Sequence, residues 1–137
     1  MIPIFVDTSF FVALVDTDDQ FNGHALKFLR KNKAPLFSSS AIVLELGAYF
    51  AQQRFRSGFF ASLNAIEKSK IEIVHVDEPL QRRAIAFFKA RSDKDWSLAD
   101  CISFLLMQER GIAADATSDA HFQQAGFIAL LRQPASN

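Results

Sequence analysis

Short apolar runs alternate with longer segments of helical pattern along most of this 137-residue chain. The runs that we expect to form strands cover residues 2–6, 36–38, 71–76, 112–116 and 127–131. The segments between them place apolar residues at the spacing of one helix face. Strands that alternate with helices in this way are typical of βα units around a parallel sheet, so the sequence predicts an α/β fold.

The predicted helices begin and end at residues that favour helix termini. One starts at Ser9 or Phe10, and the others cover 19–31, 41–54, 58–68, 79–90 and 97–109. The serines at 38–40 are suited to cap a helix start, Pro79 suits a first helical turn, and Gly111 suits the position just after a helix.

Composition limits the class of protein. The chain is 50% hydrophobic with 15 Phe, so we expect a single domain over 1–132 with one continuous core, and a frayed tail at 133–137. The formal net charge is zero, which argues against a general polyanion-coating protein. The single cysteine, Cys101, excludes an internal disulfide and a cysteine-rich zinc site. There is no signal-peptide pattern and no membrane-spanning apolar stretch, so we expect a cytoplasmic protein without membrane contact.

Four acids lie in largely apolar surroundings at or near helix starts: Asp7, Glu45, Asp100 and Asp119. Each has an ordinary structural explanation. Asp7 and Asp119 follow predicted strands and are suited to cap the next helix. Asp100 ends the segment Ser97-Leu98-Ala99-Asp100, which matches a capping box. Glu45 has the position of a common helical glutamate, although nearly all of its neighbours are apolar.

Together the four acids indicate a metal site. The carboxyl ends of parallel strands meet at one edge of the sheet, where ligands bind, so we expect these side chains to converge there. Burying so many carboxylates without a partner is costly, and a divalent cation that acts on phosphate would neutralise them. The sequence therefore predicts a small metal-dependent nuclease. Either Glu45 or Asp119 would take the proton of the attacking water, and one or two ions would suit the set.

The nature of the donors selects the cation. Carboxylate oxygens without paired His or Cys favour Mg²⁺ or Mn²⁺ over zinc. The histidines at positions 24, 75 and 121 lack the spacing of a metal site, and we interpret His121 as a surface or core residue. Three hydroxyls are suited to orient the ligands, those of Thr8, Ser97 and Ser118.

The motifs that carry these acids resemble the PIN domain family. They are residues 5–9 (FVDTS), 42–45 (IVLE), 95–101 (DWSLADC) and 116–127 (ATSDAHFQQAGF). Within that family, their spacing and the chain length resemble the VapC-type toxins of bacterial toxin-antitoxin pairs. The resemblance covers the chain from Ile4 to about Phe127. Two residues depart from the usual pattern, because Asp115 stands where similar sequences carry a small apolar residue and Ala120 replaces a commoner polar one.

The resemblance implies a three-layer α/β/α PIN-like fold with a parallel sheet of four or five strands. It also implies Mg²⁺- or Mn²⁺-dependent cleavage of RNA, a homodimer, and a small cognate antitoxin that blocks the site. Asp7, Glu45, Asp100 and Asp119 match the acidic tetrad of the family, with Asp7 and Asp100 as the principal metal ligands.

Basic and aromatic residues predict the surfaces that would bind RNA or a protein partner. Cations that are suited to capture RNA occur at 54–56, 82–83 and 89–94. Trp96, beside the helix that carries Asp100, would either stack a base or pack in the core. The Phe surplus predicts a groove for the dimer partner or the antitoxin.

Two alternative functions stay open. One is a nuclease for RNA processing or structured DNA outside a toxin pair, and the other is a non-catalytic binding module on a PIN scaffold. A phosphotransfer receiver is excluded, since it needs an acidic pair after the first strand and a lysine near the last.

Overall fold

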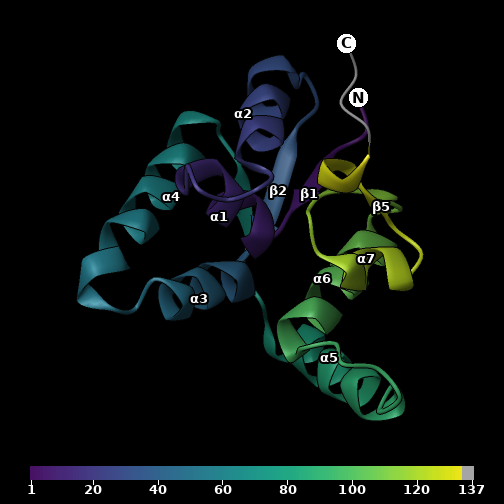
Figure 1. Cartoon of the computed structure of the whole chain (residues 1–137). Coiled ribbons are helices and arrows are strands. Elements are labelled where there is room, and N and C mark those ends of the chain that lie inside the picture. The colour runs from purple at the N-terminus through teal and green to yellow at the C-terminus, as the bar shows by residue number, and fades with distance from the viewer. Residues whose placement is uncertain (134–137) are drawn as a thin grey trace.

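The computed structural model describes residues 1–133, which form a five-stranded parallel sheet in the order β3-β2-β1-β4-β5 (Figure 1). The strands are β1 (Ile4–Val6), β2 (Leu36–Ser39), β3 (Glu72–Val74), β4 (Ala114–Ala116) and β5 (Ile128–Ala129). The helices are α1 (Thr8–Val15), α2 (Asn22–Lys31), α3 (Ser40–Tyr49), α4 (Arg56–Lys68), α5 (Glu78–Ala90), α6 (Leu98–Glu109) and α7 (Ala120–Gln124). Two 3₁₀ turns cover Gln53–Phe55 and Leu130–Arg132. The predicted α/β fold is confirmed. Of the tail predicted at 133–137, all but Gln133 lies outside the described residues.

Helices cover both faces of the sheet, which confirms the three layers. From β1 the chain moves outward through β2 to β3, and the right-handed crossovers of parallel strands place α1 to α4 on one face. The chain then returns past β1 to β4 and β5, so α5, α6 and α7 lie on the other face (Figure 1). The order of the strands therefore reverses between β1 and β4.

Phenylalanine fills the core between these layers. Phe5 of β1 is wholly buried and stacks on Phe122 of α7, with 6.4 Å between ring centroids. Phe104 of α6 meets Phe122 edge to face at 4.9 Å. On the opposite face, Phe10 of α1 meets Phe28 of α2. This packing fixes β1, α6 and α7 relative to one another.

Several elements are shorter than the sequence predicted. The first strand starts at Ile4 instead of residue 2, because Pro3 has no N–H to donate and Ile2 is exposed. The helix predicted over 41–54 ends at Tyr49, where the ring of Phe50 packs against Gly58. A Cβ at Gly58, in the first turn of α4, would lie 2.5 Å from that ring, so the packing of Phe50 requires glycine at this position. These shifts leave the order of elements unchanged.

Helix capping follows the predicted signals. The Ser39 hydroxyl caps α3, Pro79 lies in the first turn of α5, and Gly111 follows α6 with a φ of 65°.

Among the residues that the structure describes, no helix combines the length and apolar character that a membrane span requires.

Two adjacent helices expose large apolar side chains. Leu44 and Tyr49 of α3 are 76% and 58% exposed, and Phe60 of α4 is 60% exposed. A neighbouring cavity of about 540 Å³ lies between α1, α3 and α4. Of the paired phenylalanines in the sequence, Phe10 and Phe11 are core residues, so only part of the Phe surplus reaches the surface.

Candidate active site

A cleft lies at the carboxyl edge of the sheet, where the strand order reverses. Parallel α/β sheets bind ligands at such a point because the loops that leave the two adjacent strands diverge there. Asp7 directly follows β1, and the segment 117–119 directly follows β4. A cavity of about 370 Å³ there is lined by side chains that include Asp7, Glu45, Asp100 and Asp119. The structure thus brings together all four acids that the sequence singled out.

Asp7 is the most deeply buried of the four, with 4% exposure. Its Oδ1 accepts a hydrogen bond from the Ser9 hydroxyl and its Oδ2 accepts one from the Thr117 hydroxyl, both at 2.9 Å. Although Asp7 occupies the N-cap position of α1, its side chain accepts no capping hydrogen bond. The ordinary explanation of Asp7 as a helix cap therefore does not account for its carboxylate.

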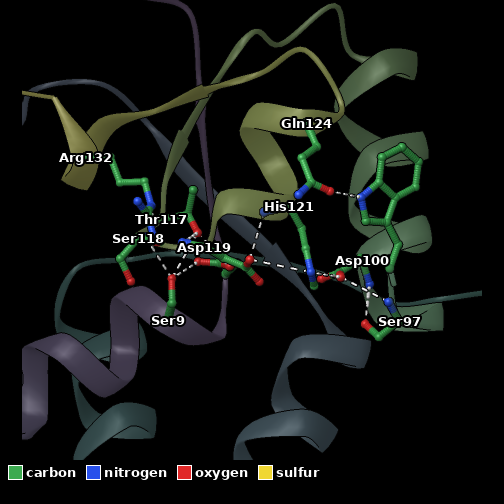
Figure 2. A network of polar contacts seen from close by, with 11 residues as sticks. Ser9, Ser97, Asp100, Thr117, Ser118, Asp119, His121, Gln124 and Arg132 are labelled. Atoms are coloured by element: carbon green, nitrogen blue, oxygen red, sulfur yellow. Dashed lines mark hydrogen bonds and ion pairs between the residues drawn. The ribbon is translucent and has the colours of Figure 1, made fainter. Parts of the chain in front are cut away.

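Asp100 forms the predicted capping box at the start of α6. Its Oδ2 accepts the Ser97 backbone N–H at 3.0 Å, and the Ser97 hydroxyl accepts the Asp100 backbone N–H at 3.0 Å. The same Oδ2 lies 3.0 Å from Nδ1 of His121 (Figure 2). Oδ1 has no hydrogen-bond partner within residues 1–133 and stays available to a ligand.

Asp119 caps the short helix α7. Its Oδ1 accepts the His121 backbone N–H at 2.9 Å and lies 3.5 Å from Nδ1 of the same residue. The backbone N–H of Asp119 donates to the Thr117 hydroxyl at 2.9 Å. Thr117 is therefore bonded to both Asp7 and Asp119, and it couples the two strand-end acids.

Glu45 reaches the cleft from α3. Its Oε1 accepts a hydrogen bond from the hydroxyl of Thr8, in the first turn of α1. The side chain is half-buried and lines the same cavity as the strand-end acids. Glu45 is thus not the exposed helical glutamate that its sequence position also allowed.

Burial and mutual repulsion disfavour negative charge in the cleft. Burial raises the pKa of Asp7 to about 8, although the hydroxyls of Thr117 and Ser9 oppose the shift. Burial also raises the pKa of Asp100 and of Glu45, and the charge of Asp119 adds to both shifts. A bound cation would reverse this preference for protonation, because it stabilises the ionised carboxylates.

Asp115 lies outside the cavity lining, beneath the cleft. It is wholly buried in β4 between Phe5 of β1 and Ala129 of β5, and neither carboxylate oxygen has a hydrogen-bond partner among the described residues. Burial, and then the charge of Asp7, hold its pKa well above the usual range. The strand register places Asp115 opposite Phe5, so the unusual acid does not displace Asp119 from the strand end.

Three residues of the site were not predicted from the sequence: His121, Ser9 and Thr117. The imidazole of His121 lies between Asp100 and Asp119 (Figure 2), although spacing alone suggested a surface or core residue. The available signal was its position two residues after Asp119, because a residue in the first turn of a helix lies close to the residue that caps that helix. Of the predicted hydroxyls, Thr8 and Ser97 contact the acids, whereas Ser118 contributes its backbone N–H to Ser9.

Three donors in the cleft stand close enough to share one ion. Ligand atoms of Asp100, Asp119 and His121 all lie within 4.8 Å of one another. Asp7 and Glu45 line the same cavity. The donor set is therefore dominated by carboxylate oxygens, with one imidazole nitrogen.

The predicted cationic segments differ in their relation to the cleft. Arg82 and Arg83 form ion pairs with Glu78 and Glu109 on the surface of α5 and α6. Arg91 and Lys94 form ion pairs with Asp93, and together with Lys89 they line a cavity of about 570 Å³ that also includes Asp95, a residue of the acidic cleft. The two cavities therefore share Asp95 as a lining residue.

Trp96 packs in the core instead of presenting its ring to solvent. It is 5% exposed, stacks on Phe87 and donates its indole N–H to Gln124 at 3.2 Å. The guanidinium of Arg91 lies over the Trp96 ring, 5.0 Å from its centroid. Trp96 thus has the core packing role, and the alternative of an exposed stacking platform does not apply.

Comparison with known proteins agrees with this geometry. The family model of the PIN domain matches residues 4–128. The chain is 31% identical over 128 residues to the 23S rRNA-specific endonuclease VapC20 of Mycobacterium tuberculosis, from strains CDC 1551 and H37Rv alike, with 91% of this chain and 95% of the relative covered. The crystal structure of M. tuberculosis VapC20, described as a sarcin-ricin loop cleaving toxin, superposes with a TM-score of 0.83 at 24% identity and covers 92% of this chain and 97% of that one. The chain therefore belongs to the PIN domain family, among its VapC-type nucleases.

Proposed function

We propose that this protein is a Mg²⁺- or Mn²⁺-dependent endoribonuclease, the toxin of a type II toxin-antitoxin pair. The observation that carries the proposal is the convergence of Asp7, Glu45, Asp100 and Asp119 on one cavity at the reversal point of the sheet. A non-catalytic module has no need to keep four repelling acids in one cleft. A bound cation would remove their repulsion while keeping them ionised.

The residues of the cleft fit such a cation. Oxygen donors suit Mg²⁺ and Mn²⁺, and Asp100 Oδ1 has no partner among the described residues. Asp7 and Asp100 would be the principal ligands, and Glu45 and Asp119 would complete the set. When bound, the ion would lower the pKa of a water molecule and neutralise charge that develops on the phosphate.

The protein's own groups would hold and orient these ligands. The hydroxyls of Ser9 and Thr117 fix both oxygens of Asp7, and the capping box fixes Asp100. Such partners keep a ligand in one rotamer and so lower the entropy cost of binding. Either Glu45, whose Oε1 accepts the Thr8 hydroxyl, or Asp119, whose Oδ1 accepts a backbone N–H, would take the proton of the attacking water.

The substrate would be RNA. The relative's name specifies 23S rRNA, and we extend the RNA class, but not that particular site, to this chain. Lys89, Arg91 and Lys94 adjoin the cleft through Asp95 and would bind phosphates beside the cleaved bond.

The partners would be a second copy of the chain and a small antitoxin. The exposed apolar side chains of Leu44, Tyr49, Phe55 and Phe60 lie on α3, α4 and the turn between them, beside the cavity of about 540 Å³. A patch of this kind is typical of protein interfaces. The cytoplasm, where such RNA and partners meet, stays the predicted location.

The test is cleavage of total RNA by the purified protein with Mg²⁺ or Mn²⁺, beside an EDTA control and Asp7→Asn. We expect discrete fragments that vanish in both controls, and fragment sizes then identify the RNA. The toxin role is tested separately by induction in a bacterial host, where growth should stop and recover when the protein encoded beside this one is co-expressed. Cleavage without growth arrest would point to an RNA-processing nuclease, and equal cleavage by Asp7→Asn would overturn the site.

A further inference from the structure

His121 is the one basic side chain among those that line the acidic cavity. The other ionisable groups that line this cavity are the phenol of Tyr49 and the carboxylates of Asp7, Asp19, Glu45, Asp95, Asp100 and Asp119. Nδ1 of His121 lies 3.0 Å from Asp100 Oδ2 and 3.5 Å from Asp119 Oδ1 (Figure 2). The ring therefore faces the two carboxylates that come from different elements, α6 and the end of β4.

The fold holds the imidazole in this place. His121 lies in the first turn of α7, and its backbone N–H is bonded to Asp119. The next residue, Phe122, is wholly buried and packs against Phe5 and Phe104. Because the core anchors α7 at Phe122, the ring of His121 is directed at the cleft without needing a bound ligand.

These separations agree with ligands of a shared ion. Ligands at about 2.1 Å from an octahedral cation lie roughly 3 Å apart in adjacent positions. The donor atoms of Asp100, Asp119 and His121 lie within 4.8 Å of one another, and Nδ1 stands at 3.0 and 3.5 Å from the two oxygens. To bind a shared ion, Nδ1 would exchange its contact with Asp100 Oδ2 for the cation and would do so as the unprotonated nitrogen of a neutral imidazole.

We propose that Nδ1 of His121 is a ligand of the cation held by Asp100 and Asp119, and that it makes the site selective for Mn²⁺ over Mg²⁺. Imidazole nitrogen binds first-row transition ions far better than Mg²⁺, which prefers oxygen. This inference rests on the proposed function and narrows its metal. In a site made only of carboxylates, His121 would serve only as an ion-pair partner of Asp100 and Asp119.

The test is pulsed electron paramagnetic resonance of Mn²⁺ added to the metal-free protein, together with titrations of Mn²⁺ and Mg²⁺. We expect ¹⁴N modulation of imidazole strength in wild type, its loss in His121→Gln, and its retention in His75→Gln, a change at an exposed histidine away from the cleft. Since loss of a residue that merely supports a ligand costs about 10–100-fold in metal affinity, His121→Gln should weaken Mn²⁺ by at least about tenfold. Mg²⁺ affinity should change less.

A second variant guards against a folding defect. His121→Asp supplies an oxygen in place of nitrogen, so Mn²⁺ should still bind without ¹⁴N modulation and the preference should shift toward Mg²⁺. Circular dichroism checks that each variant is folded. The inference is overturned if bound Mn²⁺ shows no imidazole coupling in wild type, or if the coupling persists in His121→Gln. In either case RNA cleavage by wild type would leave the proposed function standing, whereas failure of wild type to bind either ion would overturn both.

Discussion

The hydroxyl of Thr117 donates a hydrogen bond of 2.9 Å to Oδ2 of Asp7, and thereby joins the ends of β4 and β1 where the strand order reverses. The two residues are 110 positions apart in the chain. The same hydroxyl accepts the backbone N–H of Asp119. One buried threonine therefore sets the relative positions of two of the four acids.

Removing that hydroxyl should loosen the site. Thr117→Val has nearly the same shape but leaves Asp7 and the Asp119 N–H without this partner, so we expect a loss of about 1–3 kcal/mol in the free energy of unfolding. Mn²⁺ affinity should fall by about 10–100-fold. Denaturant unfolding and metal titration measure the two effects. Thr117→Ser keeps the hydroxyl and should stay close to wild type; equal losses in both variants would contradict the role of the hydrogen bonds.

Asp7→Asn should abolish metal-dependent cleavage while the fold stays intact. The amide keeps the shape but loses the charge that a cation needs, so we expect cleavage to fall by at least about 100-fold. The rate of RNA fragment formation in Mn²⁺ measures it. Asp16→Asn changes an exposed acid after α1 and should cut normally. Normal cleavage by Asp7→Asn would remove Asp7 from the site.

The metal-free protein should lose stability as the pH rises from about 4 to about 8. Burial raises the pKa of Asp7 from its usual 3.8 to about 8, so between these values the folded state binds more protons than the unfolded chain. Stability is then complete below the lower value and falls as the pH approaches the higher one, by at least about 2 kcal/mol.

Thermal unfolding with EDTA at several pH values measures this dependence. Asp7→Asn should reduce this dependence, which the other acids with a raised pKa retain in part, and should unfold at a higher temperature than wild type at pH 7.5. Addition of Mn²⁺ should restore wild type but not the variant. A metal-free wild type that becomes more stable toward pH 8 would contradict the assignment.

Asp115→Val should stabilise the protein. Neither oxygen of this wholly buried carboxyl has a partner among the described residues, and valine suits a central strand. We expect a gain of about 1–3 kcal/mol in the free energy of unfolding, measured with urea. Asp115→Asn leaves buried polar atoms and should gain much less. If Asp115→Val keeps a stable fold but no longer cleaves RNA, Asp115 contributes to the activity of the site from its buried position beneath the cleft.

The double variant Arg91→Gln, Lys94→Gln should bind RNA more weakly. These cations line the cavity next to the acidic cleft, so their loss should reduce the salt dependence of RNA binding by about one or two phosphate contacts. Binding of a non-cleaved RNA to Asp7→Asn protein, measured at several salt concentrations, tests this. Lys31→Gln, at the exposed end of α2, is the matched control. An unchanged slope would place the RNA elsewhere.

Local patterns along the chain were sufficient for the order of strands and helices and for most helix caps. Ser97 and Asp100 form their capping box because its four residues are contiguous, and Gly111 ends α6 for a similarly local reason. The four acids could be singled out because charge among apolar neighbours needs an explanation. Element ends were less predictable, as where Phe50 ends α3 by packing against Gly58.

The partners of those acids depended on contacts between distant segments. Thr117 meets Asp7 only because β4 pairs with β1, and His121 meets Asp100 only because Phe122 anchors α7 against α6. Asp115 is buried because β4 lies inside the sheet, with β1 and β5 on either side. Strand order, register and core packing are properties of the whole chain, so residue types and spacing could identify the ligands but not the groups that hold them.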